Sequence, residues 1–147
     1  MKIEAVELCI KRAYNLELDI QDEHVYNDQE AAKIFCSTIG NCNAEHVAAI
    51  CLDRYEKILN YHTVCIGETD SVKVALAQLF RYALLSNAVK LYVAHNHPSG
   101  VLEITSDDIE MTKKIHHIAS LFDISLVDSL IVSGSDHVSI RRHCKEL

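Results

Sequence analysis

The sequence lacks several features that would place it in a large functional class. No run of apolar residues approaches the length of about 18 residues that a membrane-spanning helix requires. No run of lysine and arginine is long enough to follow a nucleic-acid backbone, and the net charge of −7 repels polyphosphate. The chain contains no internal repeat and no low-complexity segment. We therefore expect neither membrane insertion nor strong binding of nucleic acid.

The 6 cysteines include no Cys-x-x-Cys pair, so the sequence does not predict a zinc ribbon. Cys51 and Cys65 lie inside apolar runs, where a free cysteine behaves as a small buried hydrophobic residue. The N-terminal residues lack the uninterrupted apolar stretch and small-residue cleavage site of a secretory leader. These features predict a reduced, cytoplasmic protein.

Apolar residues, by contrast, are plentiful enough for one folded domain. A chain of 147 residues with 49% hydrophobic content can build one core and is too short to build two. We predict a single domain over residues 1–147, with an N-terminal segment at 1–40 and a core at 41–141. The first 26 residues are compatible with either a helix or an edge strand.

Hydrophobic periodicity predicts strands and helices in alternation after this segment. Asn27 and Gly40 are typical of the two ends of a helix, which we predict at about 28–39. A turn at 67–70 precedes a long helix that begins at Ser71, and an amphipathic helix follows at 106–122. The predicted strands cover residues 47–53, 57–66, 91–94, 125–132 and 137–140. This order indicates an α/β fold with a mixed sheet and flanking helices, in which ligands bind at the carboxyl ends of buried strands.

The segment AHNHPSG, residues 94–100, follows one of these strands and contains the only proline of the chain. Residues i and i+2 of an extended backbone project to the same side, so His95 and His97 can bind one metal ion. Asn96 points the other way and is free to hold the loop. A histidine pair alone is weak evidence, because such pairs also occur as hydrogen-bonded surface residues, and a catalytic zinc site needs three protein ligands.

Asp108 is the best candidate for the third ligand. It lies in the first turn of the predicted helix, where a side chain leans back toward the preceding loop. The alternative is structural, since Thr105 and Asp108 match a capping box in which the acid binds the backbone of the capping residue. One orientation of the Asp108 side chain allows it both to cap the helix and to bind a metal ion. Asp107 is the neighbouring candidate, and only the spacing described next favours Asp108 over it.

The string AHNHPSG, with the later residues of this helix, resembles the RadC-like branch of the JAB/MPN domains, which carry a JAMM metal motif. That motif is a glutamate, then His-x-His, ten residues and an aspartate, with a serine three positions before the aspartate. The resemblance extends from about Glu45 to Ile140 and implies the JAB/MPN architecture, which is cytidine-deaminase-like. Further matching positions are Gly67, Asn87, Ala88, Ile109 and Thr112.

The resemblance implies a role for each residue of the motif. His95, His97 and Asp108 would hold Zn²⁺ with water as the fourth ligand. Glu45, which without the resemblance would be an ordinary solvated acid, would take a proton from that water and deliver it to the leaving amine. Thr105 stands where the family has serine, whose hydroxyl helps to stabilise the oxyanion.

Three departures from the family pattern affect the loops rather than the ligands. Threonine keeps the hydroxyl of the family serine but adds a methyl group, so Ser106 is an alternative donor. Ile104 replaces a proline, and residues 75–78 replace a His-Pro-Arg-Glu stretch. None of these changes removes a proposed zinc ligand.

We therefore expect a zinc-dependent hydrolase that cleaves a peptide or isopeptide bond, with a peptide or protein conjugate as substrate. The alternative is a non-catalytic or DNA-repair-associated accessory protein, since longer RadC-like proteins carry a helix-hairpin-helix module that we do not expect here. Nuclease and metallo-β-lactamase patterns fit poorly, because HNH nucleases disperse these residues and Ser99 occupies the aspartate position of the lactamase motif. The sequence is also compatible with a homodimer.

Asp128 lies in an apolar strand and therefore needs a polar partner. That partner is either the imidazole of a metal ligand or a structural hydrogen-bond donor. His116 and His117 are adjacent on a helix and face different directions, so a second shared metal site is not predicted.

Overall fold

The protein is described by a computed structural model, which covers residues 1–65, 71–145 and 147 and the side chains of these residues except 65 and 71–74. The strands are β1 (His46–Leu52), β2 (Ile58–Cys65), β3 (Lys90–Asn96), β4 (Ser125–Ser133) and β5 (Asp136–Ser139). The helices are α1 (Asp28–Thr38), α2 (Ser71–Leu85), α3 (Ser106–Leu121) and α4 (Ile140–His143).

The strands of this part of the chain form one sheet in the order β2-β1-β3-β4-β5. The pair β3–β4 is parallel, and the other neighbouring pairs are antiparallel. The predicted α/β class with a mixed sheet is therefore confirmed. The strands β1 and β2 form an antiparallel hairpin. The predicted turn at 67–70 and residue 66 lie outside the described residues.

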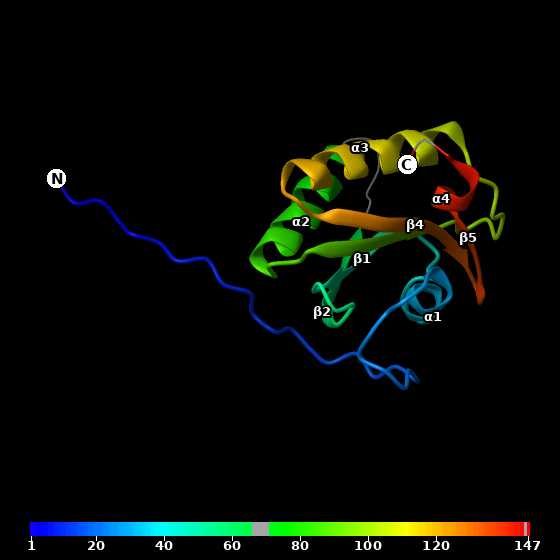
Figure 1. Ribbon diagram of the computed structural model, residues 1–147, viewed down its shortest axis with the longest axis horizontal. Coiled ribbons are helices and arrows are strands. Elements are labelled where there is room, and N and C mark those ends of the chain that lie inside the picture. The colour runs from blue at the N-terminus through cyan, green and yellow to red at the C-terminus, as the bar shows by residue number, and fades with distance from the viewer. Residues whose placement is uncertain (66–70, 146) are drawn as a thin grey trace.

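Helices cover both faces of the sheet, with α2 and α3 on one face and α1 on the other (Figure 1). Because successive side chains of a strand point to opposite faces, each central strand supplies both layers of the core. Ala49 and Val93 belong to the cluster under α2 and α3, whereas Ile50 and Tyr92 belong to the cluster under α1. This burial on both faces explains why β1 and β3 are almost continuously apolar in sequence.

The end of α1 packs closely against the turn between β4 and β5. The backbone N–H of Gly134 donates to the carbonyl oxygen of Gly40 at 2.8 Å. A Cβ atom on Gly40 would lie 2.4 Å from the carbonyl oxygen of Gly134. The sequence analysis identified Gly40 as a helix end, and the structure adds that a second element occupies the space a side chain would need.

Most predicted strand ends agree with the structure within one residue, and two differences have a structural reason. The prediction ended the third strand at Ala94, but β3 continues through His95 and Asn96, which pair with Ile131 and Val132 of β4. Residues 95 and 96 are therefore strand rather than loop, because the flanking strands continue the ladder past the apolar run. At the other end of the chain, Ile140 begins the short helix α4 instead of ending a strand.

Residues 1–23 form neither a helix nor a strand in this structure, although their sequence is compatible with either. The first residues of the segment run away from the sheet and helices (Figure 1), whereas Leu18 packs partly against the core under α1. Its first contact of strand type is a bridge between His24 and Lys57. Whether residues 1–147 make up a single domain stays a prediction.

The thiol of Cys51 is free and fully buried, as predicted, and burial raises its pKa to about 11. The side chain of Cys65 is outside the described residues. None of the helices in the described ranges is long and apolar enough to cross a membrane.

Candidate metal centre

Three side chains from two elements converge at the end of β3. His95 lies in the strand, His97 directly follows it, and Asp108 lies in the first turn of α3. The Nε2 atoms of the two histidines are 3.1 Å apart, and Asp108 Oδ1 lies 2.9 Å from His95 Nε2 and 3.8 Å from His97 Nε2. Among the described residues this is the one group of at least three potential ligands whose donor atoms all lie within 4.8 Å of one another.

The backbone holds His97 in the orientation that a metal ligand needs. Its Nδ1 atom donates a hydrogen bond to the carbonyl oxygen of Val101 at 2.7 Å. The proton is thus on Nδ1, and the lone pair of Nε2 points toward His95 and Asp108. A backbone carbonyl on the second ring nitrogen is a common way to orient a histidine ligand.

The carboxylate of Asp108 caps α3 and faces the histidines at the same time. Its Oδ2 atom accepts hydrogen bonds from the backbone N–H and the hydroxyl of Thr105, at 2.8 and 2.7 Å. The capping box predicted from the sequence is present. Oδ1 remains directed at His95, so the structural and the ligand interpretations of Asp108 hold together.

The electrostatic surroundings keep Asp108 ionised. Burial by itself raises the pKa of this carboxyl group, but hydrogen bonds from His95 and from the backbone and hydroxyl of Thr105 outweigh burial and hold the pKa well below its ordinary value. An ionised carboxylate beside two imidazoles is a donor set suited to a divalent cation.

The spacing of the three donor atoms fits zinc. Two atoms that each lie about 2.0–2.1 Å from zinc at the tetrahedral angle are about 3.3 Å apart. The three separations in this cluster, 2.9, 3.1 and 3.8 Å, lie on both sides of that value. The cluster supplies three protein ligands and leaves the fourth tetrahedral position without one, which is the composition of catalytic rather than structural zinc sites.

Glu45 borders the same groove as the cluster. The groove is lined by Glu45, Val47, His95, Asp107, Asp108, Glu110, Met111 and Lys114. Glu45 directly precedes β1, and the antiparallel register pairs Val47 with His95, so Glu45 comes opposite the histidine end of β3. Its side chain is exposed. Asp107 also lines the groove, but it does not belong to the three-residue cluster.

Asn96 ties the segment that carries Glu45 to the histidine strand. Its side chain is fully buried, accepts a hydrogen bond from the backbone N–H of His46 at 2.7 Å, and donates to the carbonyl oxygens of Cys42 and Ala44 at 3.0 and 3.1 Å. The sequence analysis left Asn96 free to hold the loop but did not identify what it holds. The available signal was a polar side chain that points into the core between two outward histidines.

The hydroxyl of Thr105, which the resemblance assigns to oxyanion stabilisation, donates its hydrogen to Asp108 in this structure. The same oxygen accepts from the backbone N–H of Asp108 at 3.3 Å. In this arrangement Thr105 orients a candidate ligand. Its role toward a substrate stays a prediction.

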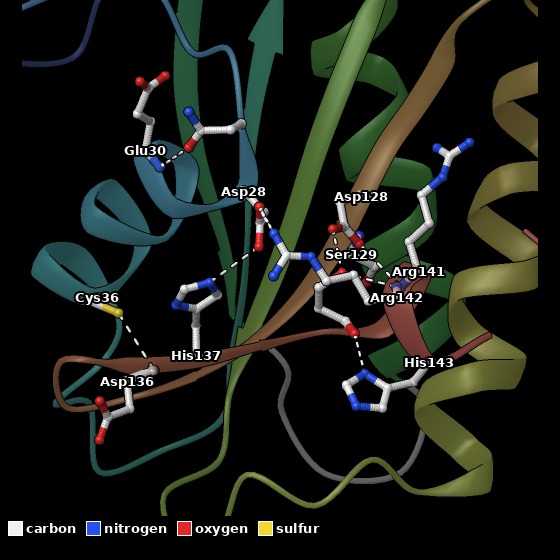
Figure 2. A network of polar contacts seen from close by, with 12 residues as sticks. Asp28, Glu30, Cys36, Asp128, Ser129, Asp136, His137, Arg141, Arg142 and His143 are labelled. Atoms are coloured by element: carbon white, nitrogen blue, oxygen red, sulfur yellow. Dashed lines mark hydrogen bonds and ion pairs between the residues drawn. The ribbon is translucent and has the colours of Figure 1, made fainter. Parts of the chain in front are cut away.

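Asp128 belongs to a structural network and not to the metal cluster. Its carboxylate accepts hydrogen bonds from the hydroxyl of Ser139 at 2.5 Å and from the backbone N–H groups of Ser129 and Arg141 at 2.7 and 3.2 Å (Figure 2). These donors come from β4, β5 and α4. Of the two partners that the sequence left open, the structural donor is therefore the one observed.

Comparison with known proteins identifies the family to which the chain belongs. The family model of the RadC-like JAB domain matches residues 25–145. A UPF0758 protein of Finegoldia magna is 34% identical over 122 residues, which are 82% of this chain and 55% of that protein. A UPF0758 protein of Haemophilus influenzae is 31% identical over 145 residues, or 98% of this chain and 65% of that protein. The chain thus spans about half to two thirds of the length of these curated relatives, and it belongs to the RadC-like JAB domain family.

Proposed function

We propose that the chain is a zinc-dependent hydrolase that uses water to cleave a peptide or isopeptide bond in a peptide or protein conjugate. The observation that carries the proposal is the convergence of one nitrogen from each of two histidines and one oxygen of Asp108 at separations suited to tetrahedral zinc. Zinc in such a site would polarise the scissile carbonyl and acidify water.

Hydrogen bonds from neighbouring residues would orient the zinc ligands. Val101 fixes the tautomer of His97, and Thr105 fixes the carboxylate of Asp108, so two of the three ligands are oriented before metal binds. Preorganised ligands matter because catalysis requires a productive geometry within a fraction of an ångström.

Glu45 would act as the general base and then as the general acid. An exposed carboxylate at the rim of the groove can accept a proton from the attacking water and pass it to the leaving amine. Asn96 would be a positioning residue, because its three hydrogen bonds hold the backbone on either side of Glu45.

The test measures zinc content and hydrolysis on the same variants. Purified chain should hold about one zinc per molecule by elemental analysis. His97→Ala and Asp108→Ala should lose most of this zinc, whereas Asp107→Ala, in the same helical turn, should keep it. Glu45→Gln should also keep its zinc but lower the hydrolysis of modifier-linked or plain peptides by about 10²- to 10⁴-fold.

Two outcomes would contradict the proposal. The first is a folded protein that holds no zinc even after zinc is added. The second is a Glu45→Gln variant with the activity of the unmodified chain, which would show that any hydrolysis arises elsewhere. Circular dichroism of each variant separates lost metal from lost fold.

A further inference from the structure

The N-terminal segment, residues 1–23, has the sequence pattern of a strand but pairs with no strand in the described part of the chain. Even-numbered positions from 6 to 20 are apolar with one exception, Arg12, and the odd-numbered positions between them are mostly polar or small. Such alternation with a period of two is typical of a half-buried strand. The apolar positions are Val6, Leu8, Ile10, Tyr14, Leu16, Leu18 and Ile20.

Three of these apolar side chains are largely exposed to solvent, and Ile10, Leu16 and Ile20 are 41%, 39% and 36% exposed. Val6 and Leu8 are 81% and 80% exposed, and Tyr14 is 71% exposed. Leu18 alone packs partly against the core cluster under α1. The segment also contains no proline or glycine, since the first glycine of the chain is Gly40, so nothing in its composition opposes a strand.

The strand β2 offers a sheet edge that none of the described strands covers, although its pairing with β1 contains a bulge opposite Cys51 and Leu52. It lies at one end of the strand order and has eight residues, ILNYHTVC, none of which is charged or proline. Natural edge strands usually carry such residues, or a cover, to prevent pairing with another chain. Leu59 of β2 is 41% exposed. The opposite edge, β5, has only four residues and contacts α1 through a hydrogen bond from Cys36 to Asp136.

The chain turns away from its own β2 at the point where pairing begins. His24 bridges Lys57, with hydrogen bonds from Val25 N–H to Glu56 and from Ile58 N–H to Glu23. Directly before Glu23, the side chain of Asp22 accepts a hydrogen bond from the backbone N–H of His24 at 3.1 Å. This contact bends the chain. Of the residues before Asp22, Leu18 still packs partly against the core cluster under α1, and the first residues of the chain then run away from the sheet (Figure 1).

We propose that the N-terminal segment of one copy adds as a strand to the free edge of β2 in a second copy, so that two copies exchange their N-terminal segments. Each chain carries both a segment with a strand pattern and an edge strand that could receive it. In a twofold dimer the segment of each copy pairs with β2 of the other, so the dimer contains two such pairs. At about 3.3 Å per residue, the alternating stretch is long enough to reach across to a neighbouring molecule.

The apolar side of the added strand should face the same layer as α1. Tyr61 of β2 contacts Phe35 of α1, with ring centroids 6.3 Å apart, and Leu59 lies two residues earlier on the strand. The helix α1 packs mainly over β4 and β5, which lie at the opposite end of the strand order from β2. The helix α1 therefore does not cover the layer next to β2, where Leu18 of the same chain packs only in part, and the even-numbered side chains of the added strand would complete this layer.

The experiment measures the mass of the full chain in solution, by light scattering or sedimentation equilibrium at micromolar concentration. The unmodified chain should have about twice the single-chain mass of 16.5 kDa. Leu8→Lys with Leu16→Lys should raise the dimer dissociation constant at least about tenfold. Cys9→Lys with Asn15→Lys adds the same charge on the other side of the strand and should have a clearly smaller effect.

A mixing experiment distinguishes exchange from other dimers. Leu59→Lys alters only the edge, so this variant and the Leu8→Lys, Leu16→Lys variant should each be mainly monomeric. Mixed together they should form a heterodimer, because one unaltered segment then meets one unaltered edge. A monomeric unmodified chain, a dimer insensitive to Leu59→Lys, or failure of the mixture to associate would each overturn the proposal.

Discussion

At the scale of single residues, the two oxygens of Asp108 have separate partners. Oδ2 accepts hydrogen bonds from the backbone N–H and the hydroxyl of Thr105, and Oδ1 faces His95. A rotation that turns Oδ1 away from His95 therefore also breaks the cap of α3. Because α3 is anchored on the sheet through Ile115 and Ala119, the fold itself holds the carboxylate in this orientation.

His62 is a second residue whose surroundings have a measurable consequence. Its ring stacks on Tyr82 with centroids 4.3 Å apart, and burial lowers its pKa to about 4. In the unfolded chain the pKa of histidine is about 6.5, so the unfolded state binds the proton first as pH falls. The stability present above pH of about 6.5 is therefore lost progressively down to about pH 4.

We expect His62→Phe to remove this part of the pH dependence while it keeps the ring stacked on Tyr82. Between pH 7 and pH 4, the protonation of His62 should lower the free energy of unfolding of the unmodified chain by an amount on the order of 2–3 kcal/mol, and the variant should lack this loss. Urea unfolding at both pH values measures it. His116→Phe, at an exposed position of α3, is the control and should keep the pH dependence of the unmodified chain. Equal pH dependence in both variants would show that His62 is not buried in the neutral form.

At the scale of elements, polar contacts fasten α1 and α4 to the edge of the sheet. Asp28 at the start of α1 lies 2.5 Å from Arg142 Nη2 of α4 and 3.4 Å from His137 Nε2 of β5 (Figure 2). At the other end of α1, Gly40 contacts the backbone of Gly134. Both ends of the helix are thus attached to the β4–β5 region, far along the chain.

Gly40→Ala should destabilise the protein more than Gly134→Ala. The added methyl group at Gly40 would lie 2.4 Å from Gly134 O and 2.5 Å from Cys36 O, which are backbone atoms that move only if α1 shifts. We expect a loss of about 2–3 kcal/mol in the free energy of unfolding. At Gly134, with φ of +58° and nothing within 4 Å of the new atom, the cost should be about 1 kcal/mol from backbone strain alone. Denaturant unfolding of both variants tests this order, and equal losses would contradict the close packing.

At the scale of the whole molecule, the net charge decides which partners are attracted. The chain carries 14 basic and 21 acidic residues, so its summed field opposes the approach of a phosphate backbone. The groove beside the metal cluster has the same character, with four carboxylates and one lysine, Lys114, which pairs with Glu110 at 2.6 Å.

We therefore expect this chain not to bind duplex DNA even at about 50 mM salt, where electrostatic binding is strongest. Fluorescence anisotropy with a labelled duplex of about 20 base pairs measures this. Binding at micromolar concentration that weakens steeply as salt rises would contradict the expectation and favour a DNA-associated role.

Much of this architecture is specified by local patterns along the chain. The ends of α1, the capping box of α3 and the alternation of strands and helices depend on residues within one or two turns of each other, and the structure agrees with each of them. The ligand candidates could also be identified locally, because two histidines two residues apart at the end of a strand project to one side and an acid in the first turn of the next helix leans toward them. The continuation of β3 through Asn96 could not be predicted from local sequence, because it depends on hydrogen bonds to other strands.

Tertiary structure alone brings together groups that are distant in sequence. Asn96 finds its partners more than 50 residues earlier in the chain, at Cys42 and Ala44, and Gly40 meets Gly134. The alternating N-terminal segment has the local pattern of a strand and still forms none, because a strand needs a neighbouring backbone to accept its hydrogen bonds. Local sequence sets what each segment can become, and the packing of the sheet decides which side chains meet.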